Sequence, residues 1–173
     1  DIIIYIDDDA LVDSNYISSY ADHFANNPNI MAAGGPIEPL YETEEPKWMS
    51  PYTKALLTAW MNYGSKVREY PKGRYPGGGN AAYRKVVFDK VGLFNTELGR
   101  KGSALLASEE KDIFDKMSAL GMKIKYLPTP VLHHCIPQTK LEKPYFERLT
   151  LQIGKSERTR TLAISKSKYI TRL

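Results

Sequence analysis

Apolar and polar positions alternate along the chain in a pattern that divides it into short strands and helices. An unbroken apolar run over residues 2–6 is typical of a buried strand, which we expect over residues 1–6. After Asp13 and Ser14, apolar side chains recur at helical spacing, which predicts a helix that ends near Asn26. The run IMAAGGPI, residues 30–37, predicts a second strand.

The second half of the chain repeats this alternation around a glycine-rich stretch, YPKGRYPGGGNAAYRK. Because strands alternate with helices, the predicted fold class is α/β. The remaining predicted elements are a loop over 37–52, helices over 51–62, 84–91 and 108–121, strands over 123–128 and 130–135, and a last helix from about Leu141.

Composition sets the class of protein. The 173 residues suffice for one domain with a hydrophobic core, and 42% apolar with 25% charged residues is usual for a globular protein. The single Cys135 fits a reducing compartment. A net charge of +4 does not indicate nucleic acid, and we find no nucleic-acid-binding signature. The sequence opens in what reads as the middle of a strand, so we expect a piece of a longer protein.

Positive charge gathers near the end of the sequence. From residue 155 to residue 173 the only acidic residue is Glu157. The cations there are Lys155, Arg158, Arg160, Lys166, Lys168 and Arg172. One interpretation is a solvated helix face. The other is contact with an anionic membrane surface or with a further segment of the protein.

Three consecutive carboxylates, Asp7, Asp8 and Asp9, follow the first apolar run. Residues two apart in an extended segment point the same way, so Asp7 and Asp9 can converge on one ligand. Ligands of open α/β sheets bind at the carboxyl ends of strands. Mg²⁺ and Mn²⁺ take carboxylate and phosphate oxygens. The sequence therefore predicts a metal–phosphate site here.

Two other interpretations of the aspartates stay open. The segment DDDAL resembles the DxDGT motif of haloacid-dehalogenase-like phosphatases, in which the first Asp is the nucleophile. That would be Asp7, although Ala10 and Leu11 stand where the motif has Gly and Thr. The third interpretation is an acidic cluster near a helix N-terminus that binds no ligand.

The order of several segments resembles the family 2 glycosyltransferases of the GT-A fold. The matching segments, from residue 1 to about 156, are YIDDDALVDSNYISSYADHF, GGPI, PKW, PGGGNAAYRKVVFDKVGLFNTELGRKG and SEEKDIFDKMSALGMKIKYLPTPVLHHCIPQTKLEKPYFERLTLQIGKS. The resemblance implies a partial GT-A fold, a mixed sheet flanked by helices. Residues 1–156 would be the C-terminal part of the catalytic domain and 157–173 a basic extension. The nucleotide-binding part that normally precedes them in the family would lie outside this sequence.

The resemblance implies how a donor would be held. Asp7 and Asp9 match the family's DxD motif, with Asp8 between them, and Asp9 would be the direct ligand of Mn²⁺ or Mg²⁺. His134 matches a late His, a further metal ligand or diphosphate contact. Lys140 stands where relatives often carry Arg, which suits phosphate.

The resemblance also assigns the acceptor side of the site. Gly78, Gly79 and Asn80 match a segment that lines the sugar and the acceptor. Glu110 stands where the family has its catalytic base, usually Asp, and Glu109 is the second choice. We expect the helix N-terminus to hold either acid ionised.

The function these matches imply is that of a metal-dependent inverting glycosyltransferase. It would transfer a sugar from a nucleotide diphosphate donor, most often UDP-linked, to a glycan or lipid-linked acceptor. A Gln-x-x-Arg-Trp signature is absent, which favours one sugar per event. The loop over 41–50, with Trp48 as a sugar-stacking residue or a loop anchor, is a candidate lid.

Further expectations concern the setting of the enzyme. We expect polysaccharide biosynthesis in the cytoplasm, at the inner face of the membrane, and self-association through an exposed sheet edge. We expect this piece alone to be inactive. The alternatives are a phosphatase that uses Asp7 and a non-catalytic carbohydrate-binding fragment.

Overall fold

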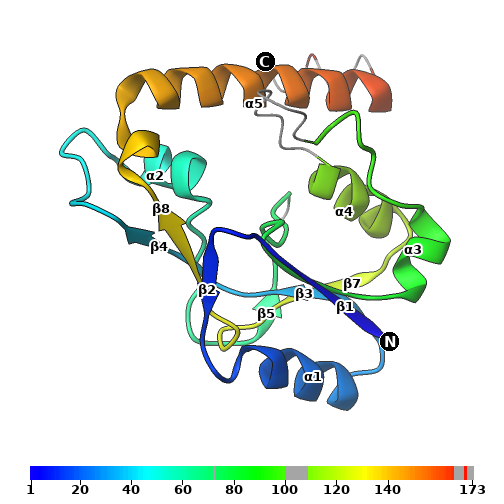
Figure 1. Ribbon diagram of the computed structural model, residues 1–173. Helices are drawn as coiled ribbons and strands as arrows, with labels where there is room; N and C mark the ends of the chain where they lie inside the picture. Colours follow the sequence, from blue (N-terminus) through cyan, green and yellow to red (C-terminus); the bar gives the residue numbers. More distant parts are fainter. Residues whose placement is uncertain (72, 100–108, 166–169, 171–173) are drawn as a thin grey trace.

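A five-stranded mixed sheet forms the centre of the protein (Figure 1). The computed structural model describes residues 1–71, 73–99, 109–165 and 170. Only β3 and β7 run parallel in this first sheet, and its other neighbours are antiparallel. In spatial order its strands are β1 (Ile2–Ile6), β6 (Asn80–Arg84), β3 (Ile30–Gly34), β7 (Lys123–Tyr126) and β5 (Arg68–Glu69).

A second, three-stranded sheet continues from the first. Its order is β2 (Ala10–Val12), β8 (Leu132–Ile136) and β4 (Ile37–Tyr41). β8 is antiparallel to β2 and parallel to β4. The chain passes from the first sheet to the second between β1 and β2, and again between β3 and β4. The three aspartates form the first of these crossings.

Helices cover both faces of the first sheet. Successive residues of a strand point to opposite sides, so neighbouring residues pack against different helices. Ala33 and Ala82 face the aromatic side chains of α1 (Tyr16–Asn26). Their neighbours Ala32, Ala81 and Tyr83 instead pack against α3 (Val86–Val91) and α4 (Glu109–Ala119). Figure 1 shows α1 below the sheet and α4 above it.

The second sheet has its own apolar cluster. Leu57 of α2 (Pro51–Thr58) meets Ile136 of β8, Leu141 of the 3₁₀ helix η1 (Gln138–Leu141) and Leu149 of α5 (Lys143–Ile164). α5 then continues across the molecule toward α4 (Figure 1). Within the described part of the chain, no helix combines the length and the apolar character needed to cross a membrane.

The structure confirms the α/β class and a mixed sheet flanked by helices, but several predicted boundaries are wrong. The loop predicted over 37–52 begins with β4, whose Pro39 is tolerated because β4 is an edge strand. The glycine-rich stretch ends in the buried strand β6, whose sequence NAAYR lacks β-branched residues. The helix predicted over 51–62 ends at Thr58, since Ala59 adopts a left-handed conformation with φ of 56°.

The end of the chain also differs from expectation. α5 crosses the boundary expected after residue 156 without a break, and Arg160 is buried. Ser108, the predicted cap of α4, and the cations Lys166, Lys168 and Arg172 lie outside the described residues. β1 is an edge strand on which Tyr5 and Ile6 are exposed, so the expected exposed edge is present. Self-association through it stays a prediction.

The amide of Asn80 joins the two sheets to α1. Its Oδ1 accepts hydrogen bonds from the hydroxyls of Tyr16 at 2.8 Å and Tyr20 at 2.6 Å. Its Nδ2 donates to the carbonyl oxygens of Pro36 at 2.8 Å and Pro130 at 3.0 Å. The side chain is fully buried, and all four hydrogen-bonding positions of the amide are used.

We expect Asn80→Ala to lower the free energy of unfolding by about 3 kcal/mol or more. The substitution leaves two carbonyl oxygens and two hydroxyls in the core, each without the hydrogen bond that the Asn80 amide provides. Urea denaturation measures the change. Asn26→Ala, at the exposed end of α1, is the control and should cost well under about 1 kcal/mol. Equal losses in the two variants would contradict a structural role for the Asn80 amide.

Candidate functional site

The aspartate turn lies at the carboxyl end of β1, opposite a turn of glycines. β6 pairs with β1 so that Asn80 is opposite Ile6, which places Gly78 and Gly79 beside the aspartates. A Cβ atom on Gly79 would overlap the Asp7 carboxylate, so only glycine allows this approach. Asp7 and Asp8 are exposed, whereas Asp9 is half-buried.

Asp9 is the centre of a cluster on the second-sheet side of the turn. Lys140 Nζ donates to Asp9 Oδ2 at 2.7 Å, and His134 Nε2 lies 3.4 Å from the same oxygen. The pairing of β2 with β8, which sets Ala10 opposite His134, brings these groups together. η1 supplies Lys140. Burial acts to raise the pKa of Asp9, but the hydrogen bond from Lys140 and the charges of His134 and Lys140 outweigh it and lower that pKa.

The ring of His134 is held in one orientation. Its Nδ1 lies 2.8 Å from the carbonyl oxygen of Thr58, which can only accept, so Nδ1 carries a proton. Nε2 is therefore the ring nitrogen that faces Asp9 Oδ2: in the charged ring its N–H points at that oxygen, and without that proton it has a lone pair for a metal ion. A backbone carbonyl that fixes the tautomer in this way is typical of metal-binding histidines. Thr58 was not predicted from the sequence, because a backbone acceptor carries no side-chain signal.

A second acidic cluster lies on the first-sheet side of the turn. Glu110 is in the first turn of α4, and its carboxyl group lies where a Cβ on Gly78 would be. Burial, reinforced by the negative charges of Glu109 and Asp7, raises the pKa of Glu110 to about 7. Burial thus raises the pKa of Glu110 against the influence of the helix N-terminus, which we expected to keep this acid ionised.

The predicted three-ligand metal set of Asp7, Asp9 and His134 is not assembled. Asp9 and His134 are adjacent, but Asp7 lies against Gly79 instead. Within residues 1–71, 73–99, 109–165 and 170, no group of three His, Cys, Asp or Glu side chains could hold a metal ion.

Two further residues have a structural role, which sequence reasoning did not give to Asn80 and gave to Trp48 as one of two alternatives. Asn80 was predicted to belong to a segment that lines the sugar and the acceptor, but its side chain is buried and saturated by protein partners. Its contribution is to hold the glycine turn. The indole of Trp48 packs on the ring of Phe146, with centroids 5.6 Å apart, which makes Trp48 an anchor of its loop. An ion pair between Glu45 and Lys54, at 2.9 Å, holds the same loop against α2.

Residues 2–152 match the family described as glycosyl transferase family group 2. The chain belongs to this family. A curated relative, the glucosyl-dolichyl phosphate glucuronosyltransferase of Haloferax volcanii, is 24% identical over 164 residues, which are 94% of this chain and 51% of the relative. The chain thus spans about half the length of that glycosyltransferase.

The fold agrees with a solved glycosyltransferase. A crystal structure of GalNAc-T7 with UDP, GalNAc and Mn²⁺ is similar with a TM-score of 0.54 and 16% identity. The match covers 88% of this chain and 31% of that chain. It confirms the partial GT-A fold that the sequence predicted.

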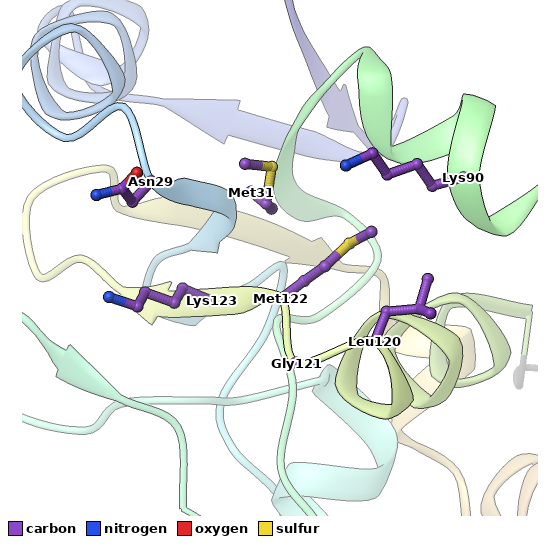
Figure 2. Close-up of a pocket in the computed structure, with 7 residues that line it drawn as sticks. All are labelled: Asn29, Met31, Lys90, Leu120, Gly121, Met122 and Lys123. Carbon is purple, nitrogen blue, oxygen red and sulfur yellow. The ribbon is translucent and has the colours of Figure 1, made fainter.

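A shallow pocket of about 470 Å³ lies elsewhere on this glycosyltransferase domain. It is located where β3 and β7 begin, whereas the aspartate and glycine turns lie where β3 ends. Figure 2 shows Met31 and Met122 between the amines of Lys123 and Lys90. None of the predicted site residues lines it.

The raised pKa of Glu110 makes stability depend on pH. The folded state binds this proton more tightly than the unfolded chain, whose glutamates titrate near 4.5, so this contribution to stability is complete below about pH 4.5 and is lost as pH rises through 7. We expect the fall in unfolding free energy between pH 4.5 and pH 8 to be smaller in Glu110→Gln than in the wild type, by on the order of 3 kcal/mol.

Chemical denaturation at a series of pH values measures this difference. Glu147→Gln, which changes an exposed acid of α5, should keep the wild-type dependence. The same pH dependence in wild type and Glu110→Gln would contradict the assignment of a raised pKa to Glu110.

Proposed function

We propose that this domain catalyses the transfer of a sugar from a nucleotide diphosphate donor, most simply a UDP-sugar, to a hydroxyl of a glycan or lipid-linked acceptor. The observation that carries the proposal is the pairing of two unlike clusters on one turn. Asp7, near Glu110, and Asp9, bonded to Lys140, are two residues apart, so their Cα atoms are at most about 7 Å apart.

The Asp9 cluster has the charges that a metal diphosphate needs. His134 Nε2 and the Asp9 carboxylate lie 3.4 Å apart, a spacing that suits two ligands of one small cation when Nε2 carries no proton. The Asp9 carboxylate suits Mn²⁺ or Mg²⁺, with diphosphate oxygens as further ligands, and Mn²⁺ accepts the histidine nitrogen more readily than Mg²⁺ does. When bound, the metal stabilises negative charge on the departing diphosphate.

The protein's own groups support the same step. Lys140 is a cation beside Asp9 that can contact a diphosphate oxygen. Thr58 keeps the His134 ring in place through its carbonyl oxygen. These groups bind the leaving group and orient the donor, which supports departure of the nucleotide without a covalent enzyme intermediate.

Glu110 is the proton acceptor in this proposal. A base acts most efficiently when its pKa lies near the working pH, and burial beside Glu109 and Asp7 raises the pKa of Glu110 to about 7. The Glu110 carboxylate removes the proton of the acceptor hydroxyl while the oxygen attacks the anomeric carbon. A single attack from the face opposite the leaving group inverts that carbon. The small residues Gly78 and Gly79 leave space for the sugars.

The two alternative functions are not favoured. The family match covers residues 2–152, and a DxDGT motif would need residues other than Ala10 and Leu11. The part of the protein that binds the nucleotide base, the acceptor, a role in polysaccharide biosynthesis and a site of action at the inner face of the membrane all stay predictions.

We expect full-length enzyme to release the nucleotide from a UDP-sugar only with Mn²⁺ or Mg²⁺, and Asp9→Ala to lower kcat/KM by about 100-fold, because the cation loses a carboxylate ligand. A panel of nucleotide sugars, assayed with and without chelator, measures both effects. Asp22→Ala, on the exposed face of α1, is the control.

Metal-independent turnover, or full activity of Asp9→Ala, would contradict the proposal. Hydrolysis of a phosphate ester that Asp7→Asn abolishes would replace it with the phosphatase alternative.

A further inference from the structure

α5 connects the two clusters of the candidate site. Its first half packs beside η1, which carries Lys140, and beside Leu57 and Ile136. Its second half contacts α4, the helix that carries Glu110. Figure 1 shows α5 above the sheets, reaching from α2 at one end to α4 at the other.

The contact between α5 and α4 is a network of charges around one buried arginine, whose partners are partly exposed. The Arg160 side chain is only 3% exposed. One of its terminal nitrogens donates to Asp115 Oδ2, and the other donates to Glu157 Oε2 at 2.9 Å. Glu157 also accepts a hydrogen bond from Lys111 Nζ at 2.9 Å. These two ion pairs therefore connect α5 to α4, and one of them ends on the residue next to Glu110.

Asp115 extends this network to the glycine turn. Its Oδ1 accepts a hydrogen bond from the Tyr75 hydroxyl at 2.5 Å. The Tyr75 ring also stacks on Phe114, with centroids 5.5 Å apart and planes at 8°. Tyr75 precedes Gly78 by three residues, so Asp115 joins α5, α4 and the turn against which Glu110 lies.

We propose that Arg160 and Glu157 are positioning residues that hold α4 and the Gly78 turn together, and thereby keep the Glu110 carboxyl group at the reacting hydroxyl. This inference rests on the proposed function, because it assigns Glu110 the role of base.

The energetics of the network favour such a role over a contribution to stability alone. A buried ion pair recovers little more than the cost of removing its charges from water, whereas it fixes the geometry of its partners. α4 transmits that geometry because it is a rigid element, with Asp115 five residues beyond Glu110. A displacement of about 1 Å at a catalytic group is enough to reduce a rate by roughly 100-fold.

The test uses full-length enzyme and compares Arg160→Met, which removes the ion pairs, with Arg158→Met, which changes an exposed arginine of the same helix. Arg160→Met should lower kcat by roughly 10- to 100-fold with an unchanged donor KM. Arg160→Lys should recover part of the rate, and Tyr75→Phe should lower it less. Arg158→Met should resemble the wild type.

A double-mutant cycle separates positioning from general damage. In the Glu110→Gln background, Arg160→Met should have no further effect on the residual rate, because the group it positions is already gone. An equal loss of rate in both backgrounds would overturn the inference.

Amide hydrogen exchange supplies a result that needs no activity. Arg160→Met should increase exchange in residues 109–115 and 73–80 but not in α1, and Arg158→Met should change neither. Unchanged exchange in both segments would overturn the inference even if transfer is observed. Increased exchange in an enzyme that transfers no sugar would uphold the network and reject the proposed function.

Discussion

The hydrogen bonds of the Asn80 amide are the constraint on which the site depends. Two tyrosine hydroxyls of α1 and two carbonyls of the turns between the sheets converge on one fully buried side chain. A buried amide with all positions satisfied is stable in one geometry only. Since Asn80 directly follows the glycine turn, this geometry also sets where Gly78 and Gly79 meet Glu110 and Asp7. Core and site are thus fixed by the same residue.

The site combines two carboxylates with opposite electrostatic surroundings. Lys140 and His134 lower the pKa of Asp9 despite its partial burial, which favours a permanent negative charge where a cation would bind. Burial and neighbouring acids raise the pKa of Glu110, which favours proton exchange near neutral pH. Acidic groups whose surroundings separate their pKa values in this way can divide the work of one reaction. Sugar transfer needs that division: one group for the leaving diphosphate and another for the attacking hydroxyl.

Local sequence patterns predicted the parts of this arrangement that depend on short segments. The apolar run of β1, the helical spacing of α1 and the acidic start of α4 were sufficient to find those elements. The order of the motifs pointed to Asp9, His134 and Glu110, whose functional roles stay predictions. Contacts between residues far apart in the sequence could not be predicted from these local patterns. β6 has a composition unlike a strand and is one because β1 and β3 pair with it on both sides. Asn80 matched a motif that lines the sugar and the acceptor, yet its buried tyrosine partners come from a helix about 60 residues earlier. The sequence placed Arg160 in a basic extension, because its partner Asp115 is 45 residues away and could not be recognised.

The dependence of kcat/KM on pH, measured for full-length enzyme and for Glu110→Gln with the preferred nucleotide sugar, tests the central claim most directly. If Glu110 removes the acceptor proton, kcat/KM of the wild type rises with a slope of one up to about pH 7 and then levels, since only the ionised carboxylate is a base. Glu110→Gln should lose that rise and lower the plateau by about 10²- to 10⁴-fold. A variant that keeps both the rise and the plateau would contradict the role of Glu110 and the account built on it.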